Sequence, residues 1–134
     1  MFIRIVLAED HAQMRVGLSQ LIDQTSDMGV AATADDGPQA VELARALKPD
    51  IVIMSVGLPH LNGVDAVRQI TGEMSTVGVI ALSMNRDARF ADQIMEAGAR
   101  GFVIKDDAFE EIIEAISQVH SGGRYISKQV ERLA

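Results

Sequence analysis

Residues 49–55 read Pro-Asp-Ile-Val-Ile-Met-Ser, so a proline and an aspartate precede four consecutive apolar residues and a hydroxyl. A short apolar run after a helix-ending proline is typical of a strand that is buried on both faces of a sheet. Similar runs recur at residues 2–8, 77–82 and 101–104, with a weaker one at residues 30–34. We therefore expect five strands.

Helical patterns fill the intervals between these strands. Met14 and Leu18 are four residues apart and fall on one face of a helix, and a similar apolar stripe covers residues 40–47. Asp35-Asp36-Gly37-Pro38 is typical of a helix start in which an Asp can cap, and Asp87 stands where the N-cap of a later helix is expected. Strands that alternate with helices in this way predict an α/β fold, with a five-stranded parallel sheet covered by helices on both faces.

Length and composition exclude several classes of protein. The chain has 134 residues, which suits a single domain, and no cysteine, which excludes disulfides and thiolate zinc sites and agrees with a cytoplasmic location. No apolar run is long enough to cross a bilayer, and the N-terminus has no signal-peptide cleavage pattern. A net charge of −7 with 4% aromatic residues indicates a chain that binds nucleic acid poorly by itself.

Polar residues follow the expected strands at one edge of the sheet. In open α/β sheets the functional site lies at the carboxyl ends of the strands. The residues at those ends are Glu9, Asp10, Ser55 to Gly57, Ser83 and Lys105. Two carboxylates suit a hard cation such as Mg²⁺, and a lysine ammonium there could neutralise the carboxylates or bind a phosphoryl oxygen.

Simpler interpretations exist for each of these residues. Asp10 could cap the helix that starts near His11, Lys105 could be a surface lysine, and Ser83 a turn residue. His11 is more typical of a helix start than of a catalyst. The sequence has no glycine-rich phosphate loop and no nucleophile elbow, so neither a nucleotide-binding loop nor a serine hydrolase is supported.

Five segments together resemble the receiver domain of bacterial two-component response regulators, over essentially the whole chain. They are residues 6–11 (Val-Leu-Ala-Glu-Asp-His), 49–54 (Pro-Asp-Ile-Val-Ile-Met), 57–63 (Gly-Leu-Pro-His-Leu-Asn-Gly), 81–83 (Ala-Leu-Ser) and 101–106 (Gly-Phe-Val-Ile-Lys-Asp). The resemblance implies a flavodoxin-like fold. The ending Gly-Gly-Arg-Tyr-Ile-Ser at residues 122–127 is similar to the NarL/FixJ subfamily, where it leads into a linker and a helix-turn-helix DNA-binding domain.

The resemblance also implies roles for individual residues. Glu9, Asp10 and the backbone carbonyl of Gly57 would hold Mg²⁺, and Ser83 and Lys105 would contact a phosphoryl group. Phe102 would be the aromatic residue that changes rotamer when the domain switches. A histidine kinase would be the phosphoryl donor, and its acceptor in the family is an aspartate at the end of the third strand.

The sequence departs from the family at that acceptor, because position 55 is a serine. A hydroxyl needs an adjacent general base to attack, and it is a poorer Mg²⁺ ligand than a carboxylate. We therefore expect no phosphorylation at Ser55, weak or absent Mg²⁺, and an ion pair between Lys105 and Asp10. With no phosphoryl group to draw Ser83 inward, we expect Phe102 outward or distributed between two positions, and weak self-association.

The expected organisation is a receiver over residues 1–121, followed by residues 122–134 as the start of a linker, with a fresh helix from residue 127 onward. The expected function is non-enzymatic signalling that controls a DNA-binding output domain, with DNA bound only through that domain and with no membrane partner. Open alternatives are an atypical receiver that works without phosphorylation, a Mg²⁺-dependent phosphatase, and a flavin- or nucleotide-binding protein. Whether the serine is natural or engineered, and whether the chain is a fragment or stands alone, both stay open.

Overall fold

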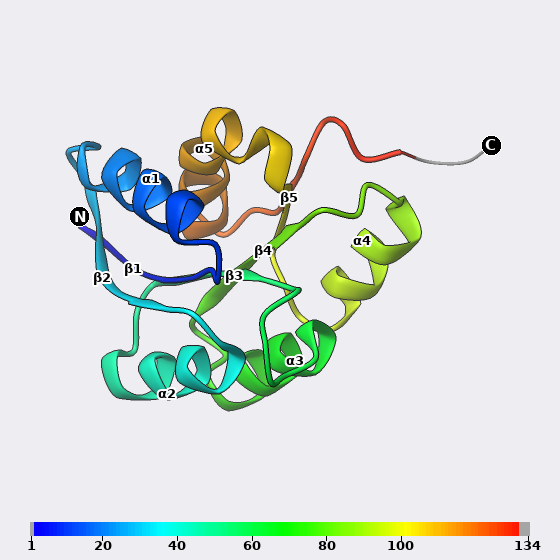
Figure 1. Cartoon of the computed structure of the whole chain (residues 1–134), viewed down its shortest axis with the longest axis horizontal. Helices are drawn as coiled ribbons and strands as arrows, with labels where there is room; N and C mark the ends of the chain where they lie inside the picture. Colours follow the sequence, from blue (N-terminus) through cyan, green and yellow to red (C-terminus); the bar gives the residue numbers. More distant parts are fainter. Residues whose placement is uncertain (1, 132–134) are drawn as a thin grey trace.

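The computed structural model describes residues 2–131 as one sheet with helices on both of its faces (Figure 1). The elements are β1 (Ile3–Ala8), α1 (Ala12–Asp23), β2 (Met28–Ala34), α2 (Gly37–Leu47), β3 (Ile51–Ser55), α3 (Gly63–Glu73), β4 (Gly78–Ser83), α4 (Ala88–Glu96), β5 (Gly101–Ile104), a 3-10 turn η1 (Lys105–Asp107), α5 (Ala108–His120) and β6 (Tyr125–Ile126). The strand order is β2-β1-β3-β4-β5-β6, and every neighbouring pair is parallel. The α/β class is confirmed.

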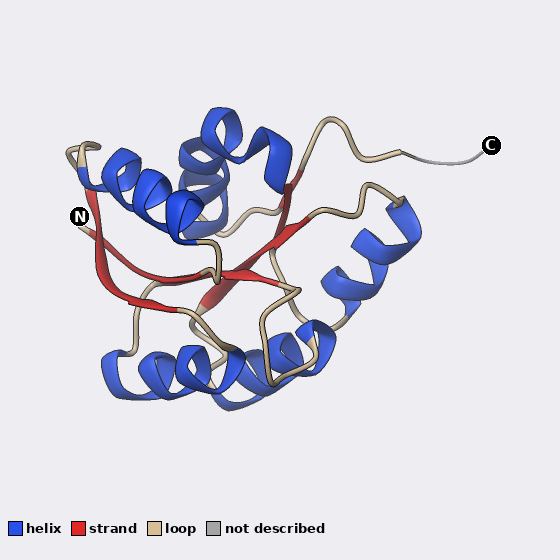
Figure 2. Cartoon of the chain, viewed as in Figure 1, coloured by secondary structure: helices blue, strands red, loops and turns tan. Residues whose placement is uncertain are grey.

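The helices form two layers. Figure 2 shows α1 and α5 on one side of the sheet and α2, α3 and α4 on the other. Successive side chains of a strand point to opposite faces, so each central strand contributes to two cores. In β3, Ile53 packs with the α1 and α5 side, whereas Val52 and Met54 pack with the α2, α3 and α4 side. Burial on both faces explains why β3 is apolar throughout.

The chain reverses its direction of travel across the sheet at β1. It passes from β1 to β2 on one side and then returns to place β3 on the other side of β1. Such a switch opens a crevice outside the carboxyl ends of the two strands involved. Glu9 and Asp10 follow β1 directly and Ser55 closes β3, so the topology brings them to the same crevice.

Side-chain N-caps stabilise the first turns of three helices. Asp36 accepts a hydrogen bond from the Gln39 amide at the start of α2, and Asp87 accepts one from the Arg89 amide at the start of α4. The Asp87 cap was expected from the sequence, and for α2 the sequence predicted an Asp cap without choosing between Asp35 and Asp36. Asn62 caps α3 in the same way. The N-cap of α1 is His11, which makes no side-chain capping bond, so Asp10 is not the cap of this helix.

The end of the chain differs from expectation. The sheet has a sixth, two-residue strand, β6, where the sequence predicted only a linker. Residues 127–131 contain a turn and an isolated bridge to Asp87 instead of the expected start of a helix, and residues 132–134 lie outside the described part. None of the helices within residues 2–131 is long and apolar enough to cross a membrane.

Candidate functional site

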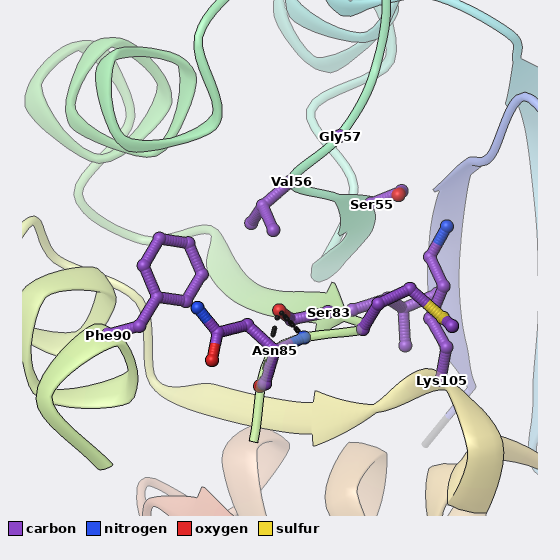
Figure 3. A pocket seen from close by; sticks show the side chains of 9 residues that line it. Ser55, Val56, Gly57, Ser83, Asn85, Phe90 and Lys105 are labelled. Atoms are coloured by element: carbon purple, nitrogen blue, oxygen red, sulfur yellow. Dashed lines mark hydrogen bonds between the residues drawn. The ribbon is translucent and has the colours of Figure 1, made fainter. Parts of the chain in front are cut away.

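A pocket of about 230 Å³ opens at the carboxyl ends of β3 and β4 (Figure 3). Its walls come from the ends of three strands and from the first turn of α4. The lining residues are Ser55, Val56, Gly57, Leu82, Ser83, Met84, Asn85, Phe90 and Lys105. The structure therefore brings together Ser55, Gly57, Ser83 and Lys105, four of the residues that the sequence predicted for the site.

Ser55 is held rigidly at the last position of β3. It pairs with Leu82 of β4, and the next residue, Val56, donates its amide to the Leu82 carbonyl at 3.0 Å. Its side chain is fully buried, and no group among residues 2–131 forms a hydrogen bond with its Oγ. A buried hydroxyl without a partner is uncommon in a folded protein. Ser55 Oγ is thus available to accept a hydrogen bond or to act as a metal ligand.

Lys105 pairs with Glu9. Its ammonium Nζ lies 2.8 Å from Oε1 and 3.1 Å from Oε2 of that carboxylate. The expected pair with Asp10 is wrong, and burial gives the reason. Glu9 is fully buried and Lys105 is only 6% exposed, whereas the Asp10 side chain is 32% exposed and reaches water. A buried carboxylate needs a counter-ion far more than a hydrated one does.

Glu9, Asp10 and His11 form an acidic cluster beside this ion pair. One potential ligand atom from each lies within 4.8 Å of the other two. A side-chain hydrogen bond with the Glu9 carboxyl lowers the pKa of Asp10, with smaller contributions from a backbone hydrogen bond, His11 and Lys105, while burial opposes the shift. Asp10 therefore carries a negative charge near neutral pH.

Ser83 is directed toward its own loop. Its Oγ accepts the amide of Asn85 at 2.9 Å and lies 3.5 Å from the Asn85 carbonyl, contacts drawn as dashed lines in Figure 3. The Asn85 side chain in turn accepts the Asp87 amide at 2.9 Å, at the start of α4. The hydroxyl is thus engaged locally and is not drawn toward position 55, as the sequence predicted.

Phe102 points inward. Its ring is fully buried among the side chains between the sheet and helices α2, α3 and α4, and it meets Phe90 edge-on with ring centroids 6.2 Å apart. The expectation of an outward or mixed position is wrong. β5 lies between β4 and β6, and the Phe90 ring provides an apolar partner from α4, so the inward position buries the ring at no cost in polar contacts.

The donor set fits a magnesium ion. Mg²⁺ prefers oxygen ligands, and it is usually held by one or two carboxylates while it keeps several waters. Asp10 offers an exposed charged carboxylate, Glu9 a second carboxylate, and Ser55 an oxygen without a hydrogen-bond partner among residues 2–131. Glu9 is less available than the sequence suggested, because Lys105 already neutralises it.

Asn85 and Phe90 are among the pocket residues that were not predicted from the sequence. Asn85 fixes the Ser83 hydroxyl, and Phe90 forms the apolar wall over Phe102. Asn85 stands two residues before the cap of α4, where a turn-forming residue is ordinary, so nothing distinguished it. Phe90 lies next to the apolar stripe of α4, which could have suggested partial burial but not its orientation.

Comparison with known proteins identifies the family. The model of the response regulator receiver domain matches residues 5–117. The chain belongs to this family. The receiver is 34% identical over 128 residues to the response regulator GacA of Pseudomonas aeruginosa and 34% identical over 128 residues to the transcriptional regulatory protein LnrK of Bacillus subtilis. The alignments cover 96% of this receiver but only 60% and 58% of those two proteins, so the chain spans little more than half of their length.

Solved structures of response regulators are similar to this receiver along almost its whole length. A LuxR-family two-component response regulator from Aurantimonas sp. SI85-9A1 is 33% identical with a TM-score of 0.91, and the alignment covers 97% of this receiver and 93% of that chain. The response regulator domain of Thermotoga maritima CheB is 31% identical with a TM-score of 0.82, covering 90% and 98% of the two chains. The NarL receiver domain from Mycobacterium tuberculosis is 26% identical with a TM-score of 0.85, covering 90% and 98%.

Proposed function

We propose that this receiver is a signalling module of a two-component system that does not accept a phosphoryl group at position 55. The observation that carries the proposal is the pairing of Lys105 with Glu9 beside a serine. β3 ends in a buried neutral hydroxyl, and the ammonium that would contact a phosphoryl group is 2.8 Å from Glu9. The resemblance to the family implies a carboxylate at this strand end, and this chain has none.

Chemistry supports the same conclusion. A serine hydroxyl becomes a nucleophile when a neighbouring base removes its proton. Ser55 Oγ has no hydrogen-bond partner among residues 2–131, so no base is in place to do this. A phosphatase of this fold would need its own nucleophile at the same strand end. Because position 55 has neither a carboxylate nucleophile nor a base beside its hydroxyl, a non-enzymatic signalling role is favoured over the phosphatase alternative.

Magnesium would bind to Glu9, Asp10 and the backbone carbonyl of Gly57. The ion supplies charge that stabilises a phosphoryl group when one is present, with Ser83 and Lys105 as the residues that would contact its oxygens. In this chain Asp10 provides the accessible charge, whereas Glu9 shares its charge with Lys105. We therefore propose weak Mg²⁺ binding.

The partners follow from the family. We propose a histidine kinase as the upstream partner and a DNA-binding domain as the output, with DNA contacted only through that domain. Transcriptional regulation is part of the name of LnrK. The net charge of −7 of this chain supports a separate DNA-binding part, because an acidic surface repels phosphates.

A second candidate is a receiver that works without phosphoryl transfer, and the position of Phe102 favours it. The ring is fully inward while the Ser83 hydroxyl accepts the Asn85 amide and is not directed toward position 55. Sedimentation of the purified chain discriminates between the two candidates. Monomers at micromolar concentration support a silent module that self-associates weakly, and a tight dimer without ligand supports the phosphorylation-independent reading.

The test of the main proposal is incubation with acetyl phosphate and Mg²⁺, followed by intact-protein mass spectrometry. We expect no mass increase for the chain as it stands and a gain of one phosphoryl group for Ser55→Asp. Ser55→Asn is the matched control, because the amide has the size of the carboxylate without its nucleophilic charge. A stable phosphoryl group on Ser55 itself would overturn the proposal.

A further inference from the structure

The last described segment of the chain is tied to the domain at both of its ends. Residues 124–131, here called the C-terminal strap, run beside β5 and pass over the N-terminal end of α4, drawn in red in Figure 1. β6 pairs in parallel with β5, as Gly101 opposite Tyr125 and Phe102 opposite Ile126. The strap therefore extends the sheet by one strand.

A buried carboxylate anchors the strap to α5. Glu111 is 9% exposed, and its Oε1 accepts hydrogen bonds from the Tyr125 hydroxyl at 2.9 Å and from the Ser127 hydroxyl at 2.8 Å. Both donors are themselves buried. Hydrogen bonds to an ionised acceptor are about twice as strong as those between neutral groups. Glu111 thus acts as a latch for the strap.

Ser127 also completes the edge of β5. Its amide donates to the Phe102 carbonyl at 2.9 Å, and its Oγ accepts the Ile104 amide at 2.9 Å. The residue after Ile104 is Lys105 of the candidate site. The strap is thereby fixed against the strand that carries both Phe102 and the site lysine.

The far end of the strap holds the loop between β4 and α4. The Glu131 amide donates to the Arg86 carbonyl at 2.7 Å, and the Ala88 amide donates to the Glu131 carbonyl at 2.9 Å. This loop follows Ser83, the last residue of β4, and contains Asn85; both residues line the pocket beside Ser55. Two backbone hydrogen bonds thus connect the last described residue of the strap to the wall of the pocket.

We propose that the C-terminal strap is a coupling element that holds the β4–α4 loop in place and links the pocket beside Ser55 to whatever follows the strap. A ligand or partner that moves the loop must break the bonds to Glu131, and a pull on the strap must release the loop. Such coupling is reciprocal. It does not depend on whether position 55 accepts a phosphoryl group.

The first test removes the hydrogen bonds to Glu111 and measures hydrogen exchange at the β4–α4 loop. Glu111→Ala leaves two buried hydroxyls without an acceptor, so we expect amide hydrogen exchange at Ala88 and Glu131 to accelerate on the order of tenfold or more. Glu110→Ala is the matched control, because Glu110 is exposed one position earlier on the same helix. Ser127→Ala is the second latch variant, for use if Glu111→Ala does not fold. Exchange at Ala88 that stays unchanged while the strap exchanges freely would overturn the proposal.

The second test removes a hydrogen bond within the β4–α4 loop and measures the solvent exposure of Tyr125 in the strap. Tyr125 is the single tyrosine and the chain has no tryptophan, so intrinsic fluorescence reports the strap alone. Asn85→Ala removes the acceptor of the Asp87 amide, and we expect acrylamide to quench Tyr125 more strongly in this variant. Asn62→Ala, which removes the cap of α3 away from the strap, is the control and should leave quenching as in the parent. Equal quenching in all three proteins would contradict coupling.

Discussion

At the scale of the residue, one buried ion pair organises the site. Lys105, which the family resemblance would place in contact with a phosphoryl group, pairs with Glu9 at 2.8 Å. The ion pair is buried, so each charge depends on the other to compensate for the water that both have lost. Asp10 stays hydrated and keeps its charge. Burial therefore decides which carboxylate the lysine neutralises.

Removal of the lysine should destabilise the fold. We expect Lys105→Met to lower the free energy of unfolding by about 3–5 kcal/mol, because it leaves the Glu9 carboxylate buried and unpaired. Adding Glu9→Gln to this variant should recover most of the loss. Arg45→Met is the control, since Arg45 and Glu73 form an exposed ion pair that water screens. Urea unfolding of the four proteins provides the measurement, and a double variant less stable than Lys105→Met would contradict the assignment.

A carboxylate at position 55 should strengthen metal binding. We expect Ser55→Asp to bind Mg²⁺ at least about tenfold more tightly than the parent, since tenfold requires only ~1.4 kcal/mol and a charged ligand a few ångström from a divalent cation provides more. Ser55→Asn separates the effect of charge from that of size and should resemble the parent. Calorimetric titration checks the prediction. Equal affinities for parent and Ser55→Asp would remove position 55 from the ligand set.

At the scale of the element, local signals predicted most helices and strands and failed at the last segment. β5 has the bounds that its apolar run predicted, Asp87 caps α4 as expected, and one of the two Asp residues expected at the start of α2, Asp36, caps that helix. Ser127 looks like the cap of a new helix, yet its hydroxyl donates to Glu111 and accepts the Ile104 amide. A local sequence pattern cannot show that the Ser127 hydroxyl is already hydrogen-bonded to Glu111, sixteen positions earlier.

Two glycines of α3 should respond in opposite ways to the same substitution. A Cβ on Gly63 would lie 2.5 Å from the Val56 carbonyl, just after the strand that ends in Ser55, whereas a Cβ on Gly72 would meet nothing within 4 Å. We expect Gly63→Ala to destabilise the domain by about 1–3 kcal/mol through overpacking and Gly72→Ala to stabilise it by about 0.5–1 kcal/mol through helix propensity. Thermal unfolding tests both substitutions. A Gly63→Ala variant as stable as the parent would show that the turn after Ser55 can shift to accommodate the added methyl group.

At the scale of the whole molecule, the sequence predicted the sheet and the place of the site but not the partners within it. Alternating strands and helices require a parallel sheet, and parallel strands bring their carboxyl ends to one edge. Which charges then pair depends on burial in three dimensions. Lys105 and Glu9 are 96 positions apart, and the inward ring of Phe102 in β5 meets Phe90 of α4. Neither fact has a local sequence pattern.

The C-terminal strap should also detach from the domain at alkaline pH. Burial raises the pKa of Tyr125 above its ordinary value of 10.0, and its hydrogen bond to Glu111 and the nearby charges of Glu111, Glu114 and Asp107 raise it further. The docked strap thus favours the neutral phenol. The stability that this contributes is fully present below about pH 10 and is lost as the pH rises through the raised pKa.

We therefore expect the tyrosinate absorbance of the folded chain to rise at higher pH than in the chain unfolded by denaturant, which should titrate near 10. Hydrogen–deuterium exchange at Ala88 should accelerate in the same interval, because an ionised Tyr125 facing three carboxylates leaves its site and takes the strap with it. Ser127→Ala, which loosens the strap but keeps Glu111, should move the tyrosine midpoint back toward 10. A folded chain that titrates near 10 while Ala88 stays protected would mean that Tyr125 is solvated and that β5 and the β4–α4 loop are held without it.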